Sequence, residues 1–87
     1  MDMAVVVVAG DLASLLASEA LCDLTYDLDA IDRFIDDHVP PGAMGFAGYL
    51  DLATRAGRMQ YAEMEGASLR AHCRAIEATA RHLGFIE

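Results

Sequence analysis

The stretch DLDAIDRFIDDH, residues 27–38, holds the side chains best suited to chemistry, because five of its twelve residues are aspartates. Carboxylates at this density can bind a divalent cation, so a calcium loop is the first hypothesis. An EF-hand loop also needs an oxygen ligand at position 5, glycine at position 6 and glutamate at position 12. Those positions hold Ile31, Asp32 and His38. Three mismatches argue against a calcium loop, and we expect no metal site.

The same stretch has the pattern of an amphipathic helix with one strongly acidic side. Leu28, Ile31 and Ile35 recur at spacings of three and four, which places them on one helical face. Asp27 is a suitable N-cap, and the VPPG that follows cannot continue a helix. The remaining carboxylates then form an acidic face, which we interpret as the partner-binding surface: Asp29, Asp32, Asp36 and Asp37.

Three interpretations of this acidic face are open. It is a solvated helix surface, or it pairs with arginines, or it meets the basic surface of another protein, where attraction speeds association in a salt-sensitive way. The arginines concerned share one flank of the last predicted helix: Arg70, Arg74 and Arg81. Exposed pairs of this kind add only about 0–1 kcal/mol each, so they would select a geometry within the chain or across a dimer.

The cysteines and histidines have no spacing typical of a catalytic or metal site. Cys22 and Cys73 lie far apart, and we expect two free thiols; a disulfide is the alternative, but nothing else in the sequence indicates export. His72 adjoins Cys73, but neighbouring residues on a helix point about 100° apart and cannot chelate together. No phosphate-binding loop or nucleophile elbow accompanies them. The sequence therefore predicts a non-enzymatic protein that needs no cofactor.

Charge and composition exclude several classes of partner. The chain of 87 residues has six arginines, no lysine and a net charge of −8 at pH 7. Nucleic acids and anionic membranes are bound through Lys and Arg, so we expect neither as a direct partner. The first residues, MDMAVVVVAG, carry an acid where a signal peptide has basic residues, and the longest apolar run is too short to span a bilayer. We expect a cytoplasmic protein.

Helical periodicity runs through most of the chain and predicts an all-α fold, with one domain over residues 1–87. Gly57 is expected to separate the last two helices, because glycine inside a helix costs about 1 kcal/mol relative to alanine. Residues 4–8, AVVVV, also suit a strand, which would have to pair with another copy of the chain. We expect a small bundle of three to four helices, approximately over residues 4–22, 27–39, 43–56 and 59–83.

Two further features concern burial. Glu19 lies within the apolar stripe of the first helix, so it either reaches water at the helix end or is buried and held by an arginine. The last helix has apolar residues at alternating spacings of four and three, which is typical of a helix-packing seam. We interpret this as a self-association seam formed by Leu69, Cys73, Ile76, Ala80 and Leu83.

The chain is 55% hydrophobic, yet at this length it buries only a modest core, a situation that oligomerisation often remedies. We therefore expect a homodimer that completes the bundle. The functional hypothesis is a small acidic regulator or inhibitor that binds a basic-surfaced macromolecule, such as a nucleic-acid-binding protein. The alternative is a structural or assembly subunit that acts by helix-mediated self-association. A small-molecule or metal-binding bundle is a third class.

Overall fold

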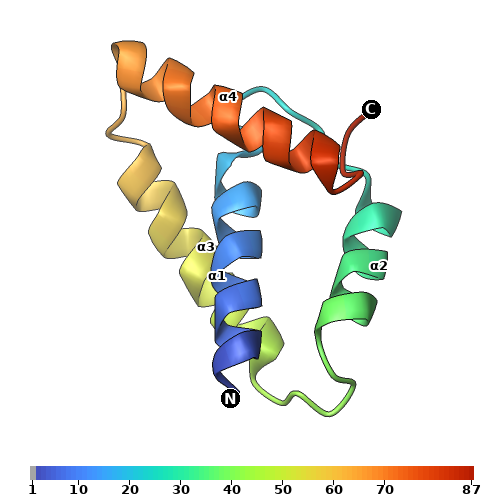
Figure 1. The fold of residues 1–87 in the computed structure, drawn as a ribbon. Helices are drawn as coiled ribbons and strands as arrows, with labels where there is room; N and C mark the ends of the chain where they lie inside the picture. Colours follow the sequence, from blue (N-terminus) through green and yellow to red (C-terminus); the bar gives the residue numbers. More distant parts are fainter. Residues whose placement is uncertain (1) are drawn as a thin grey trace.

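The computed structural model describes residues 2–87, and within them it contains four α-helices and no strand (Figure 1). The all-α prediction is confirmed, and the strand alternative for residues 4–8 is wrong because these residues lie in the first helix. The helices are α1 (Met3–Ser18), α2 (Leu28–His38), α3 (Phe46–Tyr61) and α4 (Gly66–His82). No helix in this part of the chain has both the length and the apolar character to cross a lipid bilayer.

Helix α1 lies at the centre of the fold. Its first turn is capped by Asp2, whose carboxylate accepts a 3.1 Å hydrogen bond from the backbone N–H of Ala4. The helix packs along α3, while α4 crosses its C-terminal end and approaches α2 on the far side (Figure 1). Buried residues therefore occur on more than one side of α1: Val5, Ala9, Leu12, Ala13, Leu15, Ala17 and Ser18.

The contact between α1 and α3 depends on Gly57, where we had placed a helix break. A Cβ added at Gly57 would lie 2.9 Å from the Cβ of Ala17, so the two helices approach too closely for a side chain there. This close packing offsets the low helix propensity of glycine, and α3 continues to Tyr61 instead of ending at residue 56. The break occurs over residues 62–65, and α4 begins with Gly66 at φ 61°.

The first helix ends earlier than residue 22, where we had expected it to end. Beyond Ser18 the chain turns, Asp23 adopts the left-handed conformation with φ 57°, and the N–H of Leu24 donates to the carbonyl oxygen of Glu19 at 2.8 Å. This turn directs the chain away from α1 and towards α2. Asp27 then caps α2, as predicted, and accepts hydrogen bonds from two backbone N–H groups at 2.9 and 3.4 Å.

Helix α2 is joined to the rest of the core by the C-terminal segment. Phe85 is completely buried, and its ring lies 5.7 Å from that of Phe34 and 5.8 Å from that of Tyr26, measured between centroids. The backbone N–H of Asp27 also donates to the carbonyl oxygen of Phe85 at 2.8 Å. The last residues are therefore part of the core, and Gly84, at φ 82°, makes the turn that brings them there.

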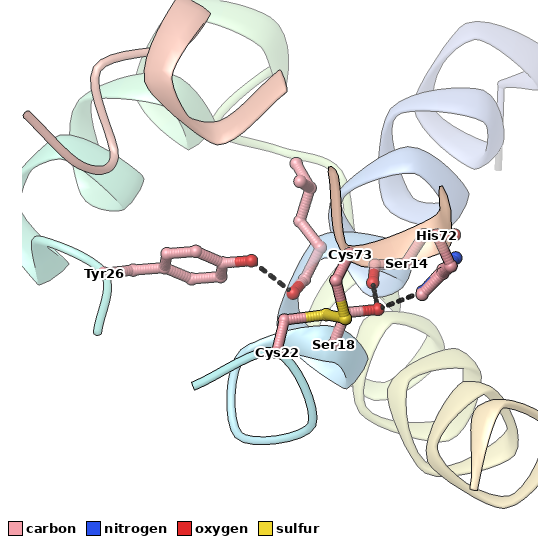
Figure 2. Close-up of a disulfide and its surroundings, with 7 residues drawn as sticks. Ser14, Ser18, Cys22, Tyr26, His72 and Cys73 are labelled. Atoms are coloured by element: carbon pink, nitrogen blue, oxygen red, sulfur yellow. Dashed lines mark hydrogen bonds between the residues drawn. A yellow bond between two sulfur atoms is a disulfide. The ribbon is translucent and has the colours of Figure 1, made fainter. Parts of the chain in front are cut away.

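Cys22 and Cys73 form a disulfide bond, so the expectation of two free thiols is wrong (Figure 2). The bond joins the turn after α1 to the middle of α4, with the two Cα atoms 5.3 Å apart. Their spacing does not indicate this pairing, because the two cysteines are 51 positions apart and meet only when α4 crosses the end of α1.

Candidate functional site

The predicted acidic face is present on α2, where Asp29, Asp32 and Asp36 lie on the side turned away from the buried Ala30 and Ile31 and Asp37 lies further round the helix. All four carboxylates are exposed: Asp29, Asp32, Asp36 and Asp37. Within residues 2–87 the ion pairs join Arg55 to Asp51 and Arg81 to Glu77, each inside a single helix. No ion pair within residues 2–87 therefore involves these four carboxylates, although the exposed Arg33 lies among them on α2.

The arginines proposed as intrachain partners lie elsewhere on the molecule. Arg70 and Arg74 are exposed on α4, where they border a shallow surface of alanines that includes Ala71 and Ala78. Arg81 uses its guanidinium on Glu77 and on the carbonyl oxygen of Glu87. Of the interpretations considered for the acidic face, pairing with this arginine row inside one chain is thus contradicted.

The predicted self-association seam of α4 is occupied within the chain. Ile76 and Ala80 are buried in the core, and Leu83 packs against it. Cys73 is bonded to Cys22, and Leu69 is half-buried. These side chains belong to the chain's own interior, because α4 applies its apolar face to α1 and to the C-terminal segment.

A polar cluster that the sequence did not predict lies beside the disulfide, between α1, α3 and α4 (Figure 2). The completely buried Ser18 places its Oγ 2.8 Å from the carbonyl oxygen of Ser14 and 2.8 Å from Nε2 of His72. The His72 ring packs on Tyr61, with ring centroids 4.4 Å apart. The Tyr61 hydroxyl donates to Ser14 Oγ at 3.2 Å. The sequence feature that could have indicated this cluster is the pair of serines four residues apart in a very apolar helix, because buried hydroxyl groups need hydrogen-bond partners.

Ser18 and His72 are the residue types of a catalytic nucleophile and its general base, but the hydrogen bond between them runs in the opposite direction. The single hydroxyl proton of Ser18 is required at the Ser14 carbonyl, which can only accept. His72 Nε2 must therefore donate to Ser18 Oγ, whereas a general base accepts the hydroxyl proton. Ser18 also has no solvent exposure. In this geometry the pair holds α4 against α1.

Glu19 lies at the end of α1, as the first of the two interpretations expected, but it is only partly exposed to water and it forms no ion pair with an arginine within residues 2–87. Its half-buried carboxylate accepts a 2.7 Å hydrogen bond from the backbone N–H of Tyr26, so it braces the turn after α1 without an arginine. The Tyr26 hydroxyl donates to the carbonyl oxygen of Leu15 at 2.8 Å. Burial, aided by the negative charge of Glu19, raises the pKa of Tyr26 to about 12.

A pocket of about 480 Å³ opens between α1, α2 and α4. Its apolar lining consists of Val8, Leu12, Leu15, Phe34, Ile76 and Leu83. Its polar lining consists of Asp11, Ser14, His38, His72 and Thr79. The volume falls in the range of about 300–1,000 Å³ that is typical of small-molecule sites. The sequence did not indicate this pocket, because its walls come from three helices that are distant in the chain.

Residues 2–87 contain no group of three or more His, Cys, Asp or Glu side chains placed to hold a metal ion. No family model, curated protein or solved structure matches the chain. The acidic face of α2 and the pocket between α1, α2 and α4 are thus the two candidate sites, and each rests on its own geometry.

Proposed function

We propose that this chain is a small, non-enzymatic interaction protein that uses the acidic face of α2 to bind the basic surface of a protein partner, as a regulator or inhibitor. The observation that supports the proposal is the exposure of four carboxylates on one helix, without an ion pair to the chain's own arginines. Like charges at this spacing repel one another, and a cationic partner relieves that repulsion.

The partner class follows from the sign of the charge. A net charge of −8 disfavours direct binding to nucleic acid or to an anionic membrane, so the proposed partner is a protein with clustered Lys and Arg. Nucleic-acid-binding proteins present such surfaces, and an acidic helix can occupy them. Attraction of this kind accelerates association and weakens steeply with added salt.

The compartment is a separate part of the proposal. A cytoplasmic location was the expectation from the sequence, but the Cys22–Cys73 bond weighs against it, because disulfides persist mainly in oxidising compartments. Alkylation of free thiols in intact cells before lysis tests the location. Both cysteines alkylated supports the cytoplasm, and a protected pair supports an oxidising compartment.

Self-association is the second candidate function, and a different surface supports it. Several large apolar side chains are exposed on α1 and α3: Val7 at 55%, Leu52 at 67% and Met59 at 77%. Exposed apolar residues in a chain this small favour burial against another copy. Light scattering on the free protein distinguishes the candidates, since a structural subunit forms oligomers without a partner.

The acidic-face proposal is tested by reversing Asp29, Asp32 and Asp36 together to Arg. We expect the wild type to capture a protein from native lysate at low salt and to lose most of it at high salt. The triple variant should lose capture with unchanged helicity, because the substituted side chains are exposed.

The matched control makes the same change in charge elsewhere. Glu63, Glu65 and Glu87 are exposed and lie outside α2, so reversing all three to Arg should leave capture intact. Capture that survives in the α2 variant, or that is lost equally in both variants, would contradict a role for this face. Capture that is insensitive to salt would contradict its electrostatic character.

A further inference from the structure

We propose that the pocket between α1, α2 and α4 binds a small organic cation, a protonated amine attached to an apolar body. This site is distinct from the acidic face of α2, and the proposal does not depend on the protein partner. Three observations support it: the apolar floor of the pocket, the hydrogen-bond polarity of its two histidines, and the carboxylate of Asp11 on its lining.

The apolar part of the pocket selects the body of the ligand. Leu12 is completely buried beneath it, Leu15 and Ile76 are also buried, and Phe34 contributes an aromatic wall. An alkyl chain in this space removes its own apolar surface from water and covers the half-buried Val8, Phe34 and Leu83, which is the main source of affinity for small apolar ligands. A volume of about 480 Å³ accommodates such a ligand.

The two histidines on the lining present hydrogen-bond acceptors. Nδ1 of His38 lies 2.8 Å from the carbonyl oxygen of Phe34, and since a carbonyl only accepts, that nitrogen carries the proton. Nε2 of His72 carries the proton that it donates to Ser18. In each neutral imidazole the second ring nitrogen is therefore an acceptor.

Asp11 gives the pocket its charge. The carboxylate is exposed and takes part in no ion pair within residues 2–87. The Ser14 hydroxyl donates to the carbonyl oxygen of Gly10, so it offers no donor to a ligand. Among the lining side chains, all within the described residues, acceptors outnumber the single hydroxyl donor of Thr79. An ammonium group supplies donors and positive charge to this surface, whereas a carboxylate ligand supplies neither.

The test compares three probes with the same chain length on the oxidised full chain: hexylammonium, 1-hexanol and hexanoate. Backbone amide NMR shifts report both the affinity and the location of binding. We expect hexylammonium to bind saturably, with shifts centred on Val8, Asp11 and Thr79. It should bind about fivefold more tightly than hexanol, the limit for an exposed charge pair, and hexanoate should bind most weakly.

Two matched pairs of variants isolate the pocket. Asp11→Asn should remove the preference for hexylammonium over hexanol, while Asp29→Asn removes the same charge from α2 and should leave it intact. Thr79→Trp fills the pocket from an exposed position and should abolish binding, while Ala78→Trp places the same ring on the other surface of α4 and should not. Circular dichroism confirms that each variant is folded.

Several results would overturn the cation site. These are equal affinity for hexylammonium and hexanol, equal behaviour of the two Asp→Asn variants, binding that survives Thr79→Trp, or shifts centred on the acidic face of α2. Such results leave the acidic-face proposal untouched, because partner capture is measured separately. Conversely, loss of capture in the α2 variant with intact hexylammonium binding separates the two sites.

Discussion

At the scale of single residues, Tyr26 ties the turn after α1 back to α1 by its hydrogen bond to the Leu15 carbonyl. Its hydroxyl is buried with the ring, which explains why the pKa of Tyr26 is raised from about 10 to about 12. A raised pKa means that the folded state holds this proton more tightly than the unfolded state does. The resulting stabilisation is complete below pH 10 and is lost as the pH rises through 12.

We therefore predict that the free energy of unfolding falls between pH 10 and 12, and that Tyr26→Phe makes this fall shallower. At pH 7 the variant should lose about 1 kcal/mol, the usual contribution of one hydrogen bond. Denaturant titrations at pH 7, 10 and 11 measure both effects. Tyr49→Phe removes an exposed hydroxyl and is the control. Identical pH profiles for the two variants would contradict the role of Tyr26.

Single residues also show where sequence reasoning works. Asp27 was predicted as a helix cap because capping is local: the carboxylate reaches backbone N–H groups two and three residues away. The Ser18–His72 hydrogen bond and the Cys22–Cys73 bond join residues more than 50 positions apart. Such contacts depend on how the helices cross, and no local pattern records the crossing.

At the scale of elements, the close approach of α1 and α3 distinguishes one interior glycine from another. Gly57 has no room for a Cβ, because Ala17 would lie 2.9 Å away, whereas Gly48 in the same helix has open space. Helical periodicity indicated which residues share a face, but it could not show which face of which helix would meet α1. For this reason Gly57 was interpreted as the end of a helix, whereas it is the point where α3 contacts α1.

This difference predicts opposite effects for the same substitution. Gly48→Ala should raise the free energy of unfolding by about 0.5–1 kcal/mol, the gain in helix propensity. Gly57→Ala should lower it, because α1 and α3 must move apart and adjacent packing is lost. Thermal unfolding of the two variants side by side measures the contrast. A stabilised Gly57→Ala protein would show that the helices tolerate a wider separation.

The packing face of α4 gives a second prediction at this scale. Ile76 is buried against the core, so Ile76→Asp places a charge in an apolar environment and should unfold the protein. Ala78 is exposed on another side of the same helix, and Ala78→Asp should leave the fold intact. Far-ultraviolet circular dichroism reports the outcome. A folded Ile76→Asp variant would mean that α4 does not pack through this face.

At the scale of the whole molecule, the fold is thin. The Cα atoms extend over 41 × 27 × 17 Å, and the shortest dimension holds about two layers of helices, since packed helix axes lie about 8–10 Å apart. A layer this thin cannot cover every apolar side chain, which accounts for the exposure of Val7 and Leu52. The helix content and the acidic face of α2 were predictable from periodicity, but the thin arrangement and the pocket between α1, α2 and α4 arise from helix crossings that periodicity does not encode.

The disulfide should supply much of the stability of so thin a fold. Closing a loop between positions 51 apart removes conformational freedom from the unfolded chain and stabilises the fold by about 4 kcal/mol. We predict that the Cys22→Ser/Cys73→Ser variant loses about this amount in urea denaturation. Reduction of the wild type should reproduce the loss. A variant as stable as the oxidised wild type would show that the bond is incidental to folding.

The Cys22–Cys73 bond also changes the covalent topology of the molecule. Residues 22–73 form a closed ring that contains α2 and α3, and the segments 2–21 and 74–87 are arms attached to it. A protease that cuts the connection over residues 39–45 opens this ring but releases no fragment. The nicked protein remains one covalent molecule until a thiol reduces the bond. Separation of its two fragments therefore requires both peptide cleavage and disulfide reduction.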